Sequence, residues 1–358
     1  MVREGQRGNR PRKARPGGSG PTIADVARRA GVSPMTVSRV VNREGNVLAG
    51  TTLKVEEAIK ALGYVPNVAA RSLAGGKQCR IALLHSNPSA AYLSEFLMGS
   101  LAQASSDNAQ IVVEYCDDAD TVETLAGRLK SHRVDAVLLP PPLCDNNGLI
   151  AKIHDLGLPM AQIATGRPSP DAYAVIIDDK AAAKAMTEHL ISLGHSRIGF
   201  IAGNENQTAS ALRKAGFEAA LQEAGIALDR TLIRPGDFSY RSGLAAAEEL
   251  LASDNPPTAV FASNDDMAAA AVAVAHRHRL EVPEDISVCG YDDTAMATTI
   301  WPELTTVRQP VADMAKVATA LLVEDVKGSS ASSDGERHRM LDYEIVRRNS
   351  DGSPRPNN

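Results

Sequence analysis

Residues 32–42, with the sequence VSPMTVSRVVN, place side chains that can form hydrogen bonds on one face of a short predicted helix. Ser33 is a suitable N-cap, and Pro34 suits the first helical position, where its missing N–H would have had no partner. Three valines follow at helical spacing and predict a buried stripe: Val37, Val40 and Val41. The opposite face holds one long cation and several smaller side chains: Pro34, Met35, Ser38, Arg39 and Asn42. This face is either a solvated surface or a surface that contacts another molecule.

The side chains of this face have the chemistry to contact DNA. The fork of the Arg39 guanidinium fits O6 and N7 of guanine, a pairing worth ~1–3 kcal/mol of discrimination between bases. Met35 offers an adaptable apolar contact, for instance to a thymine methyl group. Short hydroxyl and amide groups suit phosphate oxygens, and such contacts position a protein on DNA without specifying sequence. The candidates for these contacts are Thr22, Ser33, Thr36, Ser38 and Asn42.

The charge distribution also favours a nucleic-acid partner for the N-terminal part of the chain. The 358 residues carry a formal net charge of −5. Residues 1–77 contain about 14 Lys and Arg and about five Asp and Glu, which gives them about +9 and leaves about −14 for the rest. A basic N-terminal part on an acidic body is typical of a protein that contacts nucleic acid through that part alone.

The N-terminal part predicts three helices and a short linker. Residues 1–20 hold almost no apolar side chains, so we expect a disordered tail. Residues 21–66 predict a helix-turn-helix domain, because Thr22 and Asp25 form a capping-box pair and Gly31 supplies the turn between two helices. A third helix is expected in TLKVEEAIKALG. In the linker, residues 67–78, Asn67 is a candidate cap for a short helix that would be marginal alone.

The body of the chain alternates short apolar runs with helical segments. Runs rich in β-branched residues predict strands at 80–85, 110–116, 134–140, 159–164, 172–178, 197–203, 258–263 and 286–292. Helical patterns fall at 92–107, 121–132, 147–156, 179–193, 209–224, 240–252, 265–279 and 310–326. This alternation indicates an α/β core of doubly wound parallel sheets, and its length favours two lobes over residues 79–349. The polar residues 350–358 are expected to form a second disordered tail.

Several classes of protein are disfavoured by composition. No apolar run approaches the ~20 residues of a membrane span, and the N-terminus has no apolar signal region, so we expect a cytoplasmic protein. Four scattered cysteines favour buried thiols in a reducing compartment over a zinc site, and we expect neither metal nor cofactor. No GxGxxG follows the first strand, and P-loop, nucleophile-elbow and HExxH motifs are absent, which argues against an enzyme.

Several segments resemble the lactose-repressor (LacI/GalR) family of bacterial transcription regulators. In the N-terminal part these are TIADVARRAGVSPMTVSRVVN and AIKALGYVPNVAARSLAGGK. In the body they are EHLISLGHSRIGFIAG, PTAVFASNDDMA, VPEDISVCGYDDT and PELTTVRQP, so the resemblance spans about residues 21–349. It implies a three-helix helix-turn-helix headpiece, a hinge helix and a two-lobed core of the periplasmic-binding-protein type. It also implies a homodimer on a near-palindromic operator.

The resemblance assigns roles to residues of the headpiece and hinge. Pro34 and Met35 take the variable positions that contact bases, and Arg39 takes the base-contacting arginine. Leu73 matches the hinge leucine that inserts into the minor groove and kinks DNA, while its alternative is a packing residue between headpiece and core. Ala70 would let two hinge helices approach each other, and Arg71 would face phosphate or the groove.

The resemblance also places an effector site in the core. Arg213 matches the family's arginine that binds ligand hydroxyls or a carboxylate, and Phe238 matches an aromatic position that stacks on a sugar. The other matching positions are Tyr92, Asn264, Asp292 and Gln309. Asp178 and Asp179 end a predicted strand, but neither is assigned to the ligand. His195 precedes a buried strand and is interpreted as structural.

Two departures from the family pattern affect the expectations. Leu48 stands where the family has a serine cap before the third helix, so Thr51 or Thr52 is expected to cap it instead. The leucine-heptad tail that makes one member a tetramer is absent, which favours a dimer. We therefore expect a transcription regulator, a repressor, controlled by a small polar effector. A sugar is favoured, a purine or nucleoside is the alternative, and a sugar receptor without DNA function is a third hypothesis.

Overall fold

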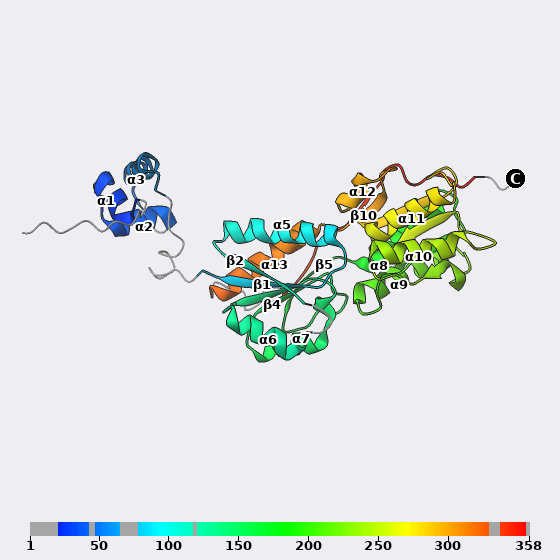
Figure 1. Cartoon of the computed structure of the whole chain (residues 1–358), viewed down its shortest axis with the longest axis horizontal. Helices are drawn as coiled ribbons and strands as arrows, with labels where there is room; N and C mark the ends of the chain where they lie inside the picture. The colour runs from blue at the N-terminus through cyan, green and yellow to red at the C-terminus, as the bar shows by residue number, and fades with distance from the viewer. Residues whose placement is uncertain (1–20, 43–46, 65–77, 117–119, 329–336, 356–358) are drawn as a thin grey trace, which may run out of the picture. The chain divides into compact units, whose positions relative to one another are not determined.

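The computed structural model describes residues 21–42, 47–64, 78–116, 120–328 and 337–355. The chain divides into two compact units, residues 1–77 and 78–358, which are described separately below (Figure 1). The tail predicted at 1–20 lies outside the described residues. The same holds for the hinge residues predicted to contact DNA: Asn67, Ala70, Arg71 and Leu73.

The first unit contains the three predicted helices: α1 (Ile23–Ala30), α2 (Pro34–Asn42) and α3 (Ala49–Leu62). Thr22 and Asp25 form the predicted capping box, and Gly31 ends α1 in a left-handed conformation with φ 67°. The Ser33 hydroxyl accepts a hydrogen bond from the Thr36 N–H at 3.1 Å, as expected for the N-cap of α2. The helices enclose a small core of Val26, Ala27, Val37, Val55 and Ala58.

The prediction for the start of α3 is wrong. The helix begins at Ala49, with Leu48 as N-cap and no side-chain cap. Thr51 and Thr52 lie inside the first turn, where their N–H groups donate to the Leu48 carbonyl at 2.8 and 3.1 Å. A side chain can cap a helix only from a position ahead of that turn, so neither threonine takes the role of the missing serine.

The second unit is built on two six-stranded sheets, one in each lobe. The first sheet has the order β11-β5-β4-β3-β1-β2, and the second has the order β12-β10-β9-β8-β6-β7. The strands of the first lobe are β1 (Arg80–His85), β2 (Gln110–Tyr115), β3 (Ala136–Leu139), β4 (Met160–Ile163), β5 (Tyr173–Ile176) and β11 (His338–Met340). Those of the second are β6 (Ile198–Ile201), β7 (Ile233–Arg234), β8 (Ala259–Ala262), β9 (Ser287–Asp292), β10 (Thr305–Arg308) and β12 (Glu344–Val346).

Helices cover both faces of each sheet. In the first lobe, α5 (Ala90–Ser106) and α13 (Val311–Val326) cover one face, and α6 (Val122–Ser131) and α7 (Asn147–Asp155) cover the other (Figure 1). In the second lobe, α8 (Asp179–Ser192) and α9 (Thr208–Glu223) pack on one face, and α10 (Tyr240–Leu251) and α11 (Asp265–Arg277) pack on the other. The predicted two-lobed, doubly wound α/β fold is therefore confirmed.

Four strands and one helix escape the sequence patterns. They are β7, β10, β11, β12 and the short α12 (Ala295–Thr299). These strands are two to four residues long, and each contains a charged side chain at or next to a sheet edge, so they show no apolar run. β12 also runs antiparallel to β10, which is the exception to the parallel pairing of both sheets.

The chain passes between the lobes three times. It leaves the first lobe after β5, returns from β10 to α13, and crosses again between β11 and β12. Each lobe is thus assembled from separate stretches of chain. Gln309 lies in the second of these crossings, between β10 and α13.

The prediction of a disordered tail from residue 350 is wrong for the residues described there. Ser350 and Asp351 are buried. The Ser350 hydroxyl donates to the Val288 carbonyl at 2.5 Å, and the Asp351 carboxylate lies 2.7 Å from Nε2 of His189 and accepts from the Thr305 hydroxyl. Hydrogen bonds hold this segment to the second lobe, so its polar composition gave no sign of its burial.

Candidate functional site

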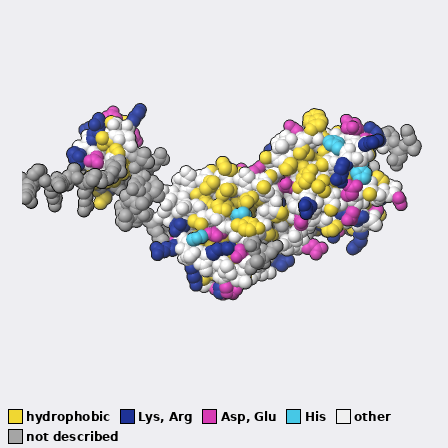
Figure 2. All heavy atoms as spheres, in the orientation of Figure 1, with side chains coloured by type: hydrophobic (Ala, Val, Ile, Leu, Met, Phe, Trp, Pro, Cys, Tyr) yellow, Lys and Arg dark blue, Asp and Glu magenta, His cyan; other side chains and the backbone are white. Residues whose placement is uncertain are grey.

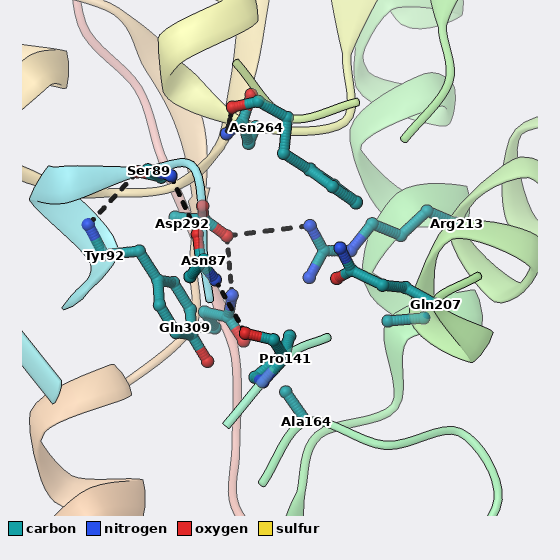
Figure 3. Close-up of a pocket in the computed structure, with 12 residues that line it drawn as sticks. Asn87, Ser89, Tyr92, Pro141, Ala164, Gln207, Arg213, Asn264, Asp292 and Gln309 are labelled. Atoms are coloured by element: carbon teal, nitrogen blue, oxygen red, sulfur yellow. Dashed lines mark hydrogen bonds and ion pairs between the residues drawn. The ribbon is translucent and has the colours of Figure 1, made fainter. Parts of the chain in front are cut away.

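A pocket between the two lobes brings together all six residues that the sequence predicts for effector binding (Figure 3). These are Tyr92, Arg213, Phe238, Asn264, Asp292 and Gln309. The pocket encloses about 330 Å³ of space that no protein atom fills, a volume that includes the open solvent at its mouth. The assignment of these residues as effector ligands stays a prediction, but their convergence is a property of the structure.

The ends of three parallel strands position half of this set. Asp292 is the last residue of β9, Asn264 follows β8, and Gln309 follows β10. Ligands of open parallel sheets bind outside the carboxyl ends of the strands, and this is where the three side chains meet. Arg213 enters from α9, and Tyr92 enters from α5 of the first lobe.

Arg213 is buried and held by several groups. Its Nε donates to Oδ1 of Asp179 at 2.8 Å, and its Nη1 donates to the Ser263 carbonyl at 2.6 Å. The guanidinium carbon lies 3.7 Å from the centre of the Tyr291 ring, a cation–π contact. Burial opposes the positive charge, but the carboxylates of Asp179 and Asp292 outweigh it and raise the pKa of Arg213. The side chain is therefore a fixed, permanently charged donor.

Asp292 is the opposing acceptor and adopts a strained backbone. Its φ of 111° lies in a region that few non-glycine residues occupy, and such strain is typical of functional sites. Its Oδ1 accepts from Nε2 of Gln309 at 2.6 Å and lies 3.6 Å from Nη1 of Arg213. Burial raises the pKa of Asp292 to about 7, although Arg213 and Gln309 favour the charged form.

Two polar atoms in the pocket lack the hydrogen bonds that burial demands. The Tyr92 hydroxyl and Oε1 of Gln309 are buried and have no partner. Burial raises the pKa of Tyr92 well above its usual range, so the hydroxyl keeps its proton. Unpaired buried polar groups cost about 1–3 kcal/mol each, and a bound ligand with hydroxyl groups would satisfy both.

Phe238 and Asn264 form one corner of the pocket. The Phe238 backbone has φ 70°, and its ring lies so close to Gly203 that a Cβ there would be 1.9 Å from the ring. Asn264 caps α11 by accepting from the Met267 N–H at 3.0 Å, and it donates to the Phe238 carbonyl at 2.9 Å. Asn264 therefore has the loop-capping role that was its alternative, while it also lines the pocket.

The structure adds pocket residues that the sequence analysis missed. They are Asn87, Ser89, Pro141, Ala164, Gln207 and Ala209. Ser89 and Asn87 follow β1 directly, so a search of every strand end would have found them. Asp178 and Asp179 are now distinguished, because Asp178 caps α8 through the Ala181 N–H whereas Asp179 binds Arg213.

Hydrogen bonds join the lobes on either side of the pocket. The Ser89 hydroxyl of the first lobe donates to Asp266 of the second at 2.5 Å. On the other side, Asp145 of the first lobe accepts from the N–H of Thr208 at 2.7 Å and from its hydroxyl at 2.9 Å. The structure thus describes a conformation in which the lobes are closed over the pocket.

His195 and the cysteines have structural roles, as predicted. The His195 ring is buried and contacts Thr258, Ser287 and the Gly352 carbonyl at 2.8–3.1 Å. All four cysteines are free and buried. Within the described part of the chain, no cluster of three His, Cys, Asp or Glu residues could hold a metal ion. None of its helices is long and apolar enough to cross a membrane.

The predicted DNA-contacting face of α2 is exposed. Met35 is 65% exposed, and Arg39 is exposed without a hydrogen bond or ion pair to any described residue. Thr22, Ser33 and Thr36 form the caps of α1 and α2 and remain at the surface. Pro34 and Ser38 lie on the same helix, and the side chain of Asn42 is outside the described residues.

Comparison with known proteins assigns the chain to a family. Residues 22–67 match the bacterial regulatory proteins of the lacI family, and residues 187–350 match the periplasmic binding protein-like domain. The HTH-type transcriptional regulator DegA of Bacillus subtilis (strain 168) is 36% identical over 82% of this chain and 88% of its own length. The chain belongs to the LacI family of transcriptional regulators, and it is a regulator rather than an enzyme.

Solved structures support the assignment. A complex of the transcriptional regulator CelR with cellobiose is similar with a TM-score of 0.70 and 33% identity, covering 92% of this chain and 99% of that one. A lac repressor dimer bound to operator and the anti-inducer ONPF has a TM-score of 0.72 and 30% identity, covering 94% and 100%. The recognition and the fold class expected from the sequence are confirmed.

Proposed function

We propose that this regulator is a dimeric repressor whose affinity for a near-palindromic operator is set by a small polar effector, a sugar, bound between the lobes. The observation that supports a sugar most directly is the pair of unsatisfied polar atoms, the Tyr92 hydroxyl and Oε1 of Gln309. A polyol supplies both donors and acceptors to such groups. The cellobiose complex of the similar CelR is consistent with this ligand class.

The rest of the pocket fits the same ligand. Arg213 presents N–H donors and Asp292 presents a carboxylate beside them, 3.6 Å from Nη1 of Arg213 (Figure 3). Phe238 adds one aromatic wall. A fixed donor and acceptor with one apolar wall is the usual arrangement of a site for a small polar molecule. A second aromatic wall, parallel to the first, would favour a purine or nucleoside instead.

DNA binding is assigned to α2. Its N-terminal residues would contact base edges in the major groove, with Arg39 and Met35 as the base contacts. In the hinge, which lies outside the described residues, Leu73 stays the proposed minor-groove wedge. A protein that acts on operator DNA in this way works in the cytoplasm.

Dimerisation is supported by apolar surface on the first lobe. Met98 and Leu101 of α5 and Val113 and Tyr115 of β2 are exposed, and Figure 2 shows hydrophobic side chains gathered over α5. A contiguous apolar patch on a protein surface is typical of an interaction site. A two-fold dimer would present two copies of α2 to the two halves of an operator.

The function is tested by a thermal-shift screen against sugars and nucleosides, followed by operator titration with and without each stabilising compound. A ligand at 100 times its dissociation constant should stabilise the protein by ~2.7 kcal/mol.

Arg213→Ala should abolish the change in operator affinity that the ligand causes, if the ligand releases DNA. Operator affinity without ligand should stay within a few-fold of that of the wild type. Lys214→Ala is the matched control, because Lys214 is exposed on the same helix. Ligand binding that leaves operator affinity unchanged would contradict the proposal.

A further inference from the structure

We infer that the pocket selects uncharged ligands over anionic ones, and that Asp179 is the residue that sets this preference. The inference rests on the proposed function, since it specifies the chemical class of the effector. Arg213 is the one lysine or arginine among the residues that line the pocket. A lone buried arginine would ordinarily favour a carboxylate or a phosphate. Whether Arg213 binds an anion therefore depends on the groups that already surround its guanidinium.

The guanidinium fork is already engaged on both of its edges. Arginine binds anions best through two parallel N–H groups, either Nε with Nη2 or Nη1 with Nη2. Here Nε donates to Asp179 and Nη1 donates to the Ser263 carbonyl, at 2.8 and 2.6 Å. Only Nη2 has no hydrogen-bond partner among the described residues. One nitrogen on each edge therefore already donates to the protein, which weakens the two-pronged contact that would hold an anion.

Asp179 is itself fixed in place beneath the guanidinium. It is 1% exposed, and its Oδ1 also accepts from the Tyr291 hydroxyl at 2.8 Å. Burial raises the pKa of Tyr291 well above its usual range, so this hydroxyl stays a donor. The Tyr291 ring also stacks on one face of the guanidinium, with the guanidinium carbon 3.7 Å from the ring centre. Asp179 is consequently a permanent partner of Arg213 and cannot swing away for a ligand.

Asp179 offsets the positive charge of Arg213, and Asp292 makes the surroundings of the ligand space net negative as it ionises around pH 7. Asp179 and Asp292 both lie within 4 Å of the guanidinium nitrogens. A ligand carboxylate or phosphate would add a further negative charge a few ångströms from two others, which disfavours the anionic form. The unpartnered Oε1 of Gln309 points to the same class of ligand, because it needs a donor and an ionised carboxylate has none. A hydroxyl group satisfies it.

The first test compares matched ligand pairs on the full-length wild-type protein by calorimetry and thermal shift. The pairs are glucose with glucuronate and glucose 6-phosphate, cellobiose with cellobionate, and adenosine with AMP. We expect any neutral member that binds to do so at least about tenfold more tightly than its anionic partner. Inorganic phosphate, with ionic strength matched by sodium chloride, should give no saturable stabilisation.

The second test removes the charge of Asp179. Asp179→Asn keeps an oxygen that can accept from Nε of Arg213 and deletes one negative charge, so it should reduce the neutral-to-anion ratio about tenfold and permit stabilisation by phosphate. Asp178→Asn is the matched control. Asp178 is exposed and caps α8 from outside the pocket. Because asparagine is an equally good cap, the ratio of neutral to anionic ligand affinity should not change.

The outcomes separate this inference from the proposed function. It is overturned if an anionic partner binds the wild-type protein as tightly as its neutral form, or if phosphate stabilises it in a saturable way that Arg213→Ala removes. If folded Asp179→Asn keeps the wild-type ratio of neutral to anionic ligand affinity, Asp179 does not set the preference. If that variant does not fold, the wild-type ratios and the phosphate titration still decide the selectivity. If an anionic ligand binds and shifts operator affinity, the inference fails but the proposed function stands. If a neutral ligand binds without shifting operator affinity, the proposed function fails but the inference stands.

Discussion

At the scale of single residues, Arg39 of the headpiece is the side chain that we propose reads the operator sequence. Its guanidinium is exposed on α2 and makes no hydrogen bond or ion pair with the described residues, so replacing it costs little folding stability. Arg39→Ala should weaken binding to the true operator by ~1–3 kcal/mol and binding to random DNA much less. Fluorescence anisotropy on both DNAs at one salt concentration measures this. Equal losses on the two would mean that Arg39 contacts phosphate alone.

Asp292 makes effector binding depend on pH. Burial raises its pKa to about 7, with Arg213 opposing the shift and Asp266 and Asp179 adding to it. Burial also raises the pKa of the neighbouring Asp265 well above its usual range, and the charge of Asp292 adds to that shift. A hydroxyl ligand that donates to Asp292 binds the ionised form, so its affinity should fall about tenfold between pH 8 and pH 6.

The same carboxyl affects stability with the opposite sign. Because the folded state of the free protein holds the proton more tightly than the unfolded chain, the contribution of Asp292 is full below pH 4 and is lost as the pH rises towards 7. Calorimetric titrations across pH 6–8 with wild type and Asp292→Asn check the affinity, and denaturation of both proteins between pH 4 and pH 7 checks the stability. A wild-type affinity that is flat with pH would show that the ligand does not contact the carboxylate.

At the scale of the elements, α9 depends on the opposite lobe for its cap. Gln207, the N-cap residue, makes no side-chain capping bond. Asp145 of the first lobe supplies one by accepting from the Thr208 N–H, and its negative charge also suits a helix N-terminus. Since α9 carries Arg213, this contact links lobe closure to the position of a side chain that we propose binds the effector.

Asp145→Ala should therefore weaken effector binding. A lost N-cap costs ~0.5–2 kcal/mol, which corresponds to a loss of about two- to thirtyfold in effector affinity if the cap forms only in the closed state. Asp178→Ala is the control, because it removes a cap that lies within one lobe. It should lower the melting temperature without changing effector affinity. Two variants that lose stability alike and keep wild-type affinity would show that the Asp145 contact does not favour closure.

At the scale of the whole molecule, the proposed dimer would make operator affinity depend on two headpieces acting together. Linking two DNA-binding units raises their combined affinity far above that of one, provided that both sites can be reached. Leu101→Asp places a charge in the exposed apolar patch on α5, so it should yield a monomer and reduce operator affinity at least about a hundredfold. Sedimentation measures the oligomeric state, and operator titration measures the affinity.

The control is Ser105→Asp, which adds a charge at an exposed polar position of the same helix. A Leu101→Asp variant that stays dimeric would place the interface elsewhere.

Local signals in the sequence were enough to predict the regular elements and the headpiece. Caps, glycine turns and apolar periodicity act between residues a few positions apart, so Thr22, Gly31 and Ser33 predicted α1 and α2 correctly. Eight of the twelve described strands were predicted for the same reason, because each lies in a run rich in apolar residues. The short strands and the buried segment at Ser350 and Asp351 were missed, because their burial comes from partners distant in the chain.

The six pocket positions were named from the sequence through family resemblance, but their surroundings were decided by tertiary structure. Asp179 and Arg213 are 34 positions apart, and Tyr291 is a further 78 positions along the chain, yet the three meet around one guanidinium. Nothing in their local sequence distinguishes Asp179 from Asp178. The charge balance around Arg213 and the strain at Asp292 arise within the folded second lobe, whereas the cap that Asp145 provides to α9 arises where the two lobes meet. Each depends on distances and burial that only the folded chain defines, because electrostatic and hydrogen-bond energies follow separation in space and not separation in sequence.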